Sequence, residues 1–463
     1  MSRWEGKKIL MIGAARQGIA LSRFLAEQGA SVILNDRRSE AELESVYQEL
    51  SGLSVIIVAG SHPIEILGDV DLVCVSGGVP LDLPLIQEAI RQDIPLSNDS
   101  QIFLEEAPCT VIGITGSAGK TTTTALVGEI AQKHYALKYP DWRVWVGGNI
   151  GNPLILDVKK MQPDDIAVVE FSSFQLEIMT KSPQIAAILN LTPNHLDRHK
   201  TMSNYVSAKS NILTHQNRDD IAVLNRDDSL IREIYPEVNG RLITFGINPP
   251  FDKQDSTYYK RGKIYLQASG QVAKIMKSDL INLRGTHNLY NVLAAVAISA
   301  AARFSLQAIY EGIVGFKGVP HRLEFIREWN GAAWYNDSIA TAPERTLAAL
   351  ESFDEPIVLL AGGRDKDLPW EKLGQGIHQK VDHLILFGEA VDLISNIVGE
   401  VKPESRPFTI DRCQTLEEAV NKAASRVEPG DVVLLSPGGT SFDEFNDFEE
   451  RGKRFIQWVK ELS

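Results

Sequence analysis

One pattern occurs three times along the chain: short apolar runs alternate with longer amphipathic stretches. Residues 8–97 contain the apolar runs KILMIG, SVILND, SVIIVAG and DLVCVS, and the part up to about residue 318 contains VIGIT, IAVVEF and IAAILN. A third set follows with AAWYND, PIVLLAGG, HLILFG and VVLLSPGG. Strands that alternate with helices form βαβ units, whose strands lie parallel in one sheet. The pattern therefore predicts an α/β protein of three consecutive α/β domains.

The chain length of 463 residues suits roughly two to four domains of about 100 to 200 residues each. Pro108 interrupts the alternating pattern, so residues 101–108 are predicted to be a linker. The polar stretch at residues 249–262 is predicted to be irregular. The predicted domains are residues 1–105, 106–318 and 319–463.

The net charge of −13 argues against nucleic acid as a partner, because phosphate backbones are usually held by a basic face. An anionic substrate must instead be held by individual Lys, Arg and backbone N–H groups. The longest apolar run, residues 292–302, is shorter than the about 18 residues of a bilayer span, and the first residues lack the apolar segment of a signal peptide. Three scattered cysteines suit reduced thiols. We expect a cytoplasmic protein without membrane insertion.

A first glycine loop, Gly13-x-Ala15-x-x-Gly18, follows the first apolar run and precedes an amphipathic stretch, and Asp36 ends the second run. Such a loop lets the backbone approach a diphosphate at a helix N-terminus, while the acidic residue accepts hydrogen bonds from a ribose or base. Ala15 replaces the middle glycine of the dinucleotide pattern. A diphosphate site and a purely structural tight turn are both compatible with this motif.

A second loop, Gly116-Ser-Ala-Gly119-Lys120-Thr121, lies between a predicted strand and a predicted helix. Backbone N–H groups and Lys120 can contact the β- and γ-phosphates of a nucleotide, and Thr121 can bind Mg²⁺. Ile114 occupies the first glycine position of the usual P-loop spacing, so the loop is a variant. It predicts a P-loop ATPase-like central domain.

Further polar residues follow the strands of the same domain. Glu170 ends one apolar run, and His195 and Asp197 follow the next. Strand ends of a parallel sheet meet at one edge, so we expect Thr121, Glu170 and His195 to form a metal and phosphate site. Asn288 and Asn291 lie on one helical face suited to a purine, although Asn288 could instead cap its helix. In the third domain four motifs follow strands: PHRLE, NDSIAT, GGRDKD and SPGGTSFDEF.

In their order, these motifs resemble the Mur ligase family over essentially the whole chain. TGSAGKTTTT is similar to that family's TG[ST]NGK[ST]T loop, and GGNIG at residues 147–151 to its substrate loop. The FSSFQLE, NHLD, GTHNLYN and PHRLE segments follow in the family's order. The resemblance implies Rossmann-like N-terminal and C-terminal domains around the P-loop domain. FSSFQLE, GGNIG and the ending SPGGTSFDEFNDFEERG are most similar to the subgroup that adds D-glutamate to UDP-N-acetylmuramoyl-L-alanine.

This resemblance implies that the first loop binds the UDP of the substrate and the second binds ATP. It implies ATP and two Mg²⁺ sites, with an acyl phosphate intermediate in peptidoglycan precursor synthesis, and a monomer is expected. Lys209 matches a family lysine that is carbamylated by CO₂. The implied catalytic residues are Lys120, Lys209 and His195, and the implied metal ligands are Thr121, Glu170, His195 and Lys209.

The resemblance also implies three substrate-binding sets. The ATP set is Gly116, Ser117, Ala118, Gly119, Lys120, Thr121, Thr122, Asn288, Asn291, Arg322 and Asp337. The UDP-substrate set is Gly13, Ala15, Gly18, Asn35, Asp36, Arg37, Ser76, Gly78, Asn149 and Gln175. Within it, Asn35, Asp36 and Arg37 are implied at the uracil end, residues 76–79 at the diphosphate, and Asn149 with Gln175 at the muramoyl-alanyl end. The glutamate set is Thr341, Lys366, Ser441 and Phe448.

Three positions depart from the family pattern. Ala118 replaces the usual loop Asn, Ile339 stands where the subgroup often has Lys, and Ala342 stands where it often has Asn. The last two leave L-glutamate open as the amino acid in place of D-glutamate. Some of the motifs also fit other classes of protein. An NAD-dependent oxidoreductase would leave the second loop unexplained, and a P-loop switch ATPase would leave the third domain without a role. Within the family, a folate polyglutamate ligase is a further alternative.

Overall fold

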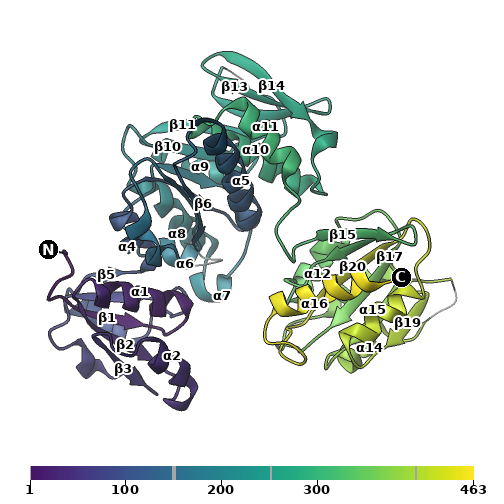
Figure 1. Cartoon of the computed structure of the whole chain (residues 1–463), viewed down its shortest axis with the longest axis horizontal. Coiled ribbons are helices and arrows are strands. Elements are labelled where there is room, and N and C mark those ends of the chain that lie inside the picture. The colour runs from purple at the N-terminus through teal and green to yellow at the C-terminus, as the bar shows by residue number, and fades with distance from the viewer. Residues whose placement is uncertain (1, 149–152, 251–252, 402–403) are drawn as a thin grey trace. The chain divides into compact units, whose positions relative to one another are not determined.

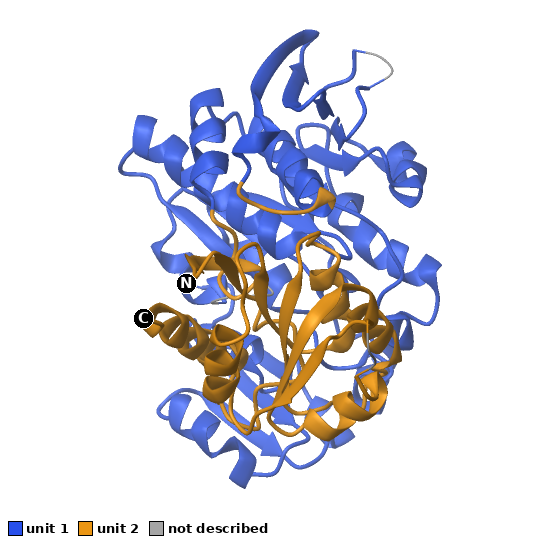
Figure 2. Ribbon diagram, turned by 90° about the vertical axis from the view of Figure 1, so that its right-hand side faces the viewer, with its two compact units in different colours: residues 1–281, 287–316 blue, residues 282–286, 317–463 orange. Residues whose placement is uncertain are grey.

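The computed structural model describes residues 2–148, 153–250, 253–401 and 404–463, whose strands form three sheets in chain order (Figure 1). Contacts group the chain into two compact units (Figure 2). Unit 1, residues 1–281 and 287–316, holds the first two sheets. Unit 2, residues 282–286 and 317–463, holds the third. The predicted class of three consecutive α/β domains is confirmed.

The first sheet has the strand order β3-β2-β1-β4-β5, and every neighbouring pair is parallel. Its central strand is the apolar run KILMI, which is buried as expected inside a parallel sheet. The chain switches sides at β1, so the loops after β1 and β4 flank the point where such sheets bind ligands. The elements are β1 (Lys8–Ile12), α1 (Arg16–Glu27), β2 (Ser31–Asp36), α2 (Glu44–Glu49), β3 (Val55–Ala59), β4 (Leu72–Val75), α3 (Pro84–Arg91), β5 (Leu96–Ser97) and α4 (Asp99–Glu106).

The segment predicted as a linker is a buried helix, α4. Asn98 caps it by accepting a hydrogen bond from Gln101 N at 2.8 Å. Ile102, Phe103 and Leu104 are almost fully buried and share one hydrophobic cluster with apolar residues of both sheets of unit 1. The linker prediction was wrong because Pro108 ends the helix without exposing it.

The second sheet has the order β14-β13-β12-β11-β10-β9-β6-β8-β7. The pairs from β7 to β12 are parallel, so β6, β8 and β9 end at one edge, with Ile114 beside Glu170 and Thr115 beside Ile188. The strands are β6 (Thr110–Thr115), β7 (Val144–Gly148), β8 (Ile166–Glu170), β9 (Ile185–Ile188), β10 (Ile221–Asn225), β11 (Arg241–Gly246), β12 (Ser256–Lys260), β13 (Lys263–Ala268) and β14 (Gln271–Lys277). The helices are α5 (Lys120–Lys138), α6 (Ser173–Leu176), α7 (Leu196–His199), α8 (Met202–Thr214), α9 (Ser229–Ile234), α10 (Thr286–Ala301) and α11 (Leu306–Gly315).

The stretch predicted as irregular contains β12, the first strand of an antiparallel meander with β13 and β14. Two tight turns join these strands. Arg261 and Gly262 have φ of 49° and 73°, and Ser269 and Gly270 have φ of 49° and 77°. Positive φ at both central residues is the mark of a type I′ hairpin, whose twist matches that of the strands. The polar side chains of this region had concealed the strand pattern.

The third sheet has the order β15-β16-β20-β17-β18-β19, with β15 antiparallel and the other pairs parallel. Its elements are β15 (Glu324–Trp329), β16 (Ala332–Asn336), α12 (Pro343–Leu350), β17 (Ile357–Gly362), α13 (Glu371–Lys380), β18 (Val381–Phe387), α14 (Val391–Val398), β19 (Thr409–Arg412), α15 (Leu416–Ala424), β20 (Val432–Gly438) and α16 (Phe448–Glu461). Among all the described residues, no helix is long and apolar enough to cross a membrane.

Candidate active site

The loop between β6 and α5 is shaped to hold phosphate. Gly119 caps α5 with φ of 82°, a left-handed conformation, and a Cβ there would lie 2.2 Å from Asn291 Oδ1. Lys120 Nζ donates to the carbonyl oxygens of Gly116 and Ser117 at 3.0 and 3.4 Å. The ammonium therefore lies beside the loop at the positive end of a helix, where anions are favoured. Thr121 and Thr122 form the first turn of α5.

The loop after β9 supports the phosphate loop. Asn190 Oδ1 accepts a hydrogen bond from Ala118 N at 2.8 Å, and Asn190 Nδ2 donates to Ala118 O at 3.0 Å. Ser117 Oγ donates to Thr192 O at 2.9 Å. The backbone of Ala118 is thus fixed although its side chain is apolar. The sequence analysis missed Asn190, and its place at the end of the run IAAILN is the signal that could have found it.

Thr121 and Glu170 are in direct contact, since Thr121 Oγ1 donates to Glu170 Oε2 at 2.8 Å. Glu170 ends β8 and is 3% exposed. Hydroxyl and carboxylate oxygens are ligands that Mg²⁺ uses together with water and substrate phosphates. The described residues contain no group of three or more His, Cys, Asp or Glu side chains able to hold a metal ion. The Thr121–Glu170 pair would suit a Mg²⁺ ion whose other ligands are nucleotide phosphates and water.

Lys209, on α8, is 1% exposed and reaches the same loop. Its Nζ donates to Gly116 O at 2.9 Å and lies 4.9 Å from the ring centroid of Tyr205. Burial, together with the charge of Lys120, lowers the pKa of Lys209 to about 6, although Glu170 acts in the opposite direction. The amine is therefore mostly uncharged at neutral pH, and the uncharged form is the nucleophile.

His195 precedes the single-turn helix α7 and has φ of 54°. Its ring lies 5.0 Å from that of Phe174, which also stacks on His199 at 5.1 Å. His199 is buried, and its Nε2 lies 2.9 Å from Ser173 Oγ. The FSSFQLE segment and the segment that carries His195 are therefore packed together. The role of His195 as a ligand of a second Mg²⁺ stays a prediction.

Asn288 and Asn291 are buried on α10. Asn291 Nδ2 donates to Asn288 Oδ1 at 2.9 Å, and Asn291 lies against Gly119 of the phosphate loop. Since α10 begins at Thr286, Asn288 lies inside the helix and is not its cap. The structure brings Asn291 to the phosphate loop, and the contact of either residue with a purine stays a prediction.

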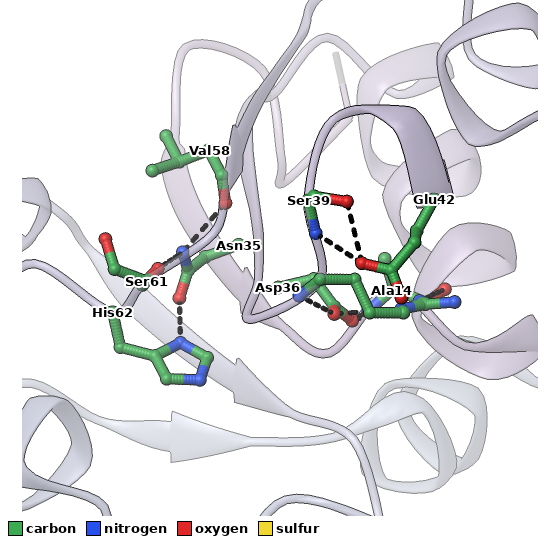
Figure 3. A network of polar contacts seen from close by, with 9 residues as sticks. Ala14, Asn35, Asp36, Ser39, Glu42, Val58, Ser61 and His62 are labelled. Carbon is green, nitrogen blue, oxygen red and sulfur yellow. Dashed lines mark hydrogen bonds and ion pairs between the residues drawn. The ribbon is translucent and has the colours of Figure 1, made fainter. Parts of the chain in front are cut away.

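The first glycine loop is shaped by the acid at the end of β2 (Figure 3). Asp36 Oδ2 accepts a hydrogen bond from Ala14 N at 2.7 Å. Arg38 Nε donates to Asp36 Oδ1 at 3.0 Å. Arg38 Nη2 also donates to Ala14 O at 2.7 Å. Burial raises the pKa of Asp36, but hydrogen bonds from Arg38 and Ala14 outweigh it and lower the pKa to about 2. Ala15 caps α1, Gly18 lies in its first turn, and Gly13 N donates to Asn35 O at 2.8 Å.

Asn35 is fully buried beside this loop (Figure 3). Its Nδ2 donates to Val58 O at 2.9 Å and to Ser61 O at 2.8 Å, and its Oδ1 bonds with His62 Nδ1. Arg37 is exposed. Asn35 therefore supports the sheet edge, and a contact of any of the three uracil-end residues with uracil stays a prediction.

Gln175 connects α6 to α4 inside unit 1. Its Oε1 accepts a hydrogen bond from Ser172 N at 2.9 Å, which completes a capping box of α6. Its Nε2 donates to Ser100 Oγ at 2.7 Å, and Asn98 Nδ2 donates to Gln175 O at 2.7 Å. This amide is thus bonded within the protein, and its contact with a muramoyl-alanyl group stays a prediction. Asn149 lies outside the described residues.

In unit 2, Asp337 follows β16 and is buried. Its Oδ2 accepts a hydrogen bond from Ser436 Oγ at 2.8 Å, and its Oδ1 accepts one from Leu323 N at 3.2 Å. Burial raises the pKa of Asp337 to about 7, although these hydrogen bonds and the charge of Arg322 oppose the rise. Arg322 and Asp337, the two residues of this unit that were predicted to bind ATP, therefore lie at one edge of its sheet.

The four residues predicted to bind the glutamate substrate follow strands at the same edge of the third sheet. They are Thr341 after β16, Lys366 after β17, and Ser441 and Phe448 after β20. Lys366 is exposed, and its ammonium makes no ion pair or hydrogen bond within the described chain. It is therefore free to meet an anion.

The two departures from the family pattern lie in the loop after β16. Ile339 N donates to His321 O at 3.1 Å. Ala342 is the N-cap of α12 and provides no side-chain cap. Asn at this position would bond the free N–H groups of the helix. The loop thus keeps its backbone bonds while lacking two polar side chains.

Arg451, on α16, was missed by the sequence analysis. It is fully buried, and its guanidinium donates to Ser338 Oγ at 3.0 Å, Thr440 O at 3.0 Å and Gly439 O at 3.2 Å. It therefore ties together the loops after β16 and β20. The sequence carried no signal for it, because Ser338 lies 113 residues away and the partners after β20 are backbone carbonyls, which any residue has.

A phosphate loop with a neighbouring hydroxyl–carboxylate pair, flanked by two further α/β domains, indicates a nucleotide-dependent enzyme. Residues 7–98 match the Mur ligase MurD-like N-terminal domain, residues 114–299 the Mur ligase middle domain, and residues 321–439 the Mur ligase glutamate ligase domain. The chain belongs to the Mur ligase family.

Two relatives are similar to this chain over nearly its whole length. A protein of Symbiobacterium thermophilum is 39% identical over 99% of this chain and 98% of its own, and one of Pelotomaculum thermopropionicum is 38% identical over 98% of each. Both are named UDP-N-acetylmuramoylalanine–D-glutamate ligase. A solved structure of MurF ligase from Thermotoga maritima in complex with ADP covers 99% of this chain and 95% of its own, at 19% identity and a TM-score of 0.54. It has the same fold.

Proposed function

We propose that this protein is an ATP-dependent ligase that joins D-glutamate to the alanyl carboxylate of UDP-N-acetylmuramoyl-L-alanine, in cytoplasmic peptidoglycan precursor synthesis. The observation that carries the proposal is the pair of loops before α1 and α5 in one member of the Mur ligase family. Two such loops suit two nucleotides, the UDP of the substrate and ATP. The names of the relatives support both substrates. An oxidoreductase would leave the second loop without a role.

The proposed reaction has two steps. The substrate carboxylate attacks the γ-phosphorus of ATP, so an acyl phosphate forms and ADP leaves. The amine of glutamate then attacks the acyl carbon, and phosphate leaves from the tetrahedral intermediate. Lys120 would neutralise the β- and γ-phosphates, and Thr121 and Glu170 would hold Mg²⁺, which supplies further charge neutralisation when bound. Positioning and electrostatics lower the barrier of such a transfer.

Lys209 is proposed to be carbamylated. Its uncharged amine would attack the carbon of CO₂, an N–C bond would form, and a proton would leave to solvent. The pKa of about 6 supports this step, because the amine is already neutral in its buried position. The product is an anionic oxygen ligand close to Glu170 and Thr121, suited to Mg²⁺, whereas an ammonium there would repel the ion. With His195 it would serve a second Mg²⁺.

The remaining roles follow the proposed domains, with boundaries near residues 105 and 318. The first domain would bind the UDP part through its two switch-point loops, and the loop before α5 in the middle domain would bind ATP. The MurF ligase structure in complex with ADP supports ATP as a substrate. In unit 2, Lys366 would pair with the side-chain carboxylate of glutamate, while Thr341, Ser441 and Phe448 frame the rest. We propose that the enzyme works as a monomer.

L-glutamate is the second candidate for the amino acid. Ile339 and Ala342 carry this candidate, because the loop after β16 lacks the polar groups that the family often has there. The names of both relatives favour the D isomer.

The test is phosphate release from ATP with UDP-N-acetylmuramoyl-L-alanine and either isomer of glutamate. We expect release that depends on the uridine substrate and is much faster with D-glutamate. Faster release with L-glutamate would change the substrate assignment and leave the ligase assignment intact. Absence of release with either isomer would contradict the proposed function.

A further inference from the structure

Arg198 of α7 reaches from the middle domain to the loop after β4 in the first domain. Its Nη1 donates to Gly77 O at 2.9 Å, and its Nη2 donates to Val79 O. Its guanidinium carbon lies 4.2 Å from the ring centroid of Phe174. Within the described residues it forms no ion pair with a carboxylate. A half-buried arginine is thus used to hold two backbone carbonyls.

The loop that Arg198 holds, residues 76–79, is the switch-point loop of the first sheet. It packs on the first glycine loop, because a Cβ on Gly13 would lie 2.8 Å from Ser76 Cβ and 3.0 Å from Val79 Cγ2. Ser76 N donates to Ile12 O at 3.0 Å, and Val79 N donates to Ser76 O at 2.9 Å. In the described part of the chain, the N–H groups of Gly77 and Gly78 have no partner. With its carbonyls fixed by Arg198, this loop keeps two N–H groups available for an anion.

The same arginine belongs to the segment that carries His195. Residues at both ends of α7 have positive φ, which is 54° for His195 and 68° for Lys200. Such conformations persist where the surroundings hold them in place. Phe174 provides that support, because its ring contacts His195, His199 and the Arg198 guanidinium. A movement of the loop at residues 76–79 would therefore be transmitted to His195.

We propose that Arg198 is a positioning residue that couples binding of the diphosphate substrate in the first domain to the phosphoryl-transfer site of the middle domain. This inference rests on the proposed function. Arginine suits the task because its planar fork reaches two carbonyl oxygens at once and stacks on an aromatic ring, whereas lysine presents a single point charge.

The test compares Arg198→Ala and Arg198→Lys with the wild-type full chain, and Arg241→Ala serves as the control because it removes an exposed ion pair with Asp255. We expect Arg198→Ala to raise KM for the uridine substrate and lower kcat, each by about tenfold or more, since small misplacements of reacting groups are costly. KM for ATP should change by less than about twofold, because the ATP loop is untouched. For Arg198→Lys, KM for the uridine substrate and kcat should lie between the values of the wild type and Arg198→Ala. The control Arg241→Ala should match the wild type.

Added methylguanidinium should restore part of the activity of Arg198→Ala, which a purely structural role would not allow. Unchanged KM and kcat, or equal losses for both nucleotides without methylguanidinium rescue, would overturn the inference. Affinity for UDP alone, measured by calorimetry, separates the two proposals. A wild-type protein that binds UDP without ligation contradicts the proposed function, and weaker UDP binding by Arg198→Ala would still support the positioning of the loop.

Discussion

Two buried titratable side chains, Lys209 and Asp337, are shifted toward the uncharged states that they rarely adopt in water at neutral pH. Burial leaves the amine of Lys209 mostly neutral and raises the pKa of Asp337 to about 7. The hydrogen-bond partners of both are neutral groups, because Lys209 contacts a carbonyl and Asp337 a hydroxyl and an N–H group. Neutral partners do not offset the loss of hydration of a charge.

The first residue-scale prediction concerns Lys209. Lys209→Ala should lower the ligation rate by about 10²-fold or more, because an anionic ligand of a metal ion would be lost. Short carboxylates such as acetate should restore part of the rate by occupying the same space. Steady-state phosphate release measures both effects. Activity close to that of the wild type would contradict the carbamate role.

The second residue-scale prediction concerns the pH dependence of stability. The pKa of Asp337 rises from 3.8 to about 7 on folding, so between these values the folded chain binds a proton that the unfolded chain has lost. The free energy of unfolding should therefore fall as pH rises from about 4 to about 7. Asp337→Asn should remove much of this slope, on the order of a few kcal/mol over the interval.

Urea unfolding, followed by a signal from unit 2 at several pH values in that range, would measure how the free energy of unfolding changes with pH. Asp354→Asn is the matched control, since the side chain of Asp354 is fully exposed. Equal slopes in the wild type and Asp337→Asn would contradict the role of Asp337.

Individual site residues could be predicted from the sequence where a recognisable motif lies at the end of a predicted strand. Thr121 and Glu170 were predicted to lie together because strand ends of a parallel sheet meet at one edge. The structure contains the contact between them. The arginines Arg38, Arg198 and Arg451 could not be predicted, because each binds backbone carbonyls of loops. A carbonyl oxygen occurs in every residue and leaves no mark in the sequence.

At the scale of elements, the meander β12–β14 depends on its turns more than on its strands. Gly262 has φ of 73°, and a Cβ there would meet nothing within 4 Å. Gly262→Ala should therefore destabilise the middle domain by about 1 kcal/mol through backbone conformation alone. Thermal unfolding would measure the change. Gly315→Ala is the control, since Gly315 ends α11 with ordinary φ and open space around it, and it should be neutral or stabilising.

Elements were predictable where apolar runs were long and central. The strands KILMI and IAVVE are buried and were expected from their composition. The strand STYYK lies near the edge of its sheet and carries polar residues, so its pattern resembled a loop. Helix α4 was missed for the opposite reason: its polar ends and Pro108 looked like a boundary, while its middle is buried between elements distant in sequence.

At the scale of the whole molecule, the two phosphate-type loops belong to different sheets of unit 1. Lys120→Ala should lower kcat/KM for ligation by about 10²- to 10³-fold, because a fixed positive charge beside the transferred phosphate is lost. Affinity for the uridine substrate should stay within about twofold, since the loops at residues 13–18 and 76–79 belong to the other sheet. Calorimetry measures the affinity for the uridine substrate, and phosphate-release kinetics measure kcat/KM for ligation. Parallel loss of both would contradict separate nucleotide sites.

The three-sheet plan was predictable from the repeated pattern, but the grouping of the sheets was not. The boundary predicted near residue 105 falls at the end of α4, whose Ile102, Phe103 and Leu104 belong to a cluster shared by both sheets of unit 1. Periodicity identifies which residues face a core, and it does not say which core that is.

The buried helix α4 has a consequence for the exchange of parts between related enzymes. A recombinant that swaps the first sheet alone must rebuild the apolar surface around Phe103, and a mismatch would leave exposed hydrophobic side chains prone to aggregation. A recombinant that swaps residues 317–463 cuts the chain where unit 1 ends, although residues 282–286 of unit 2 then stay with the host chain. An exchange designed to transfer the proposed glutamate site should therefore move unit 2, whereas the two N-terminal sheets should be exchanged together.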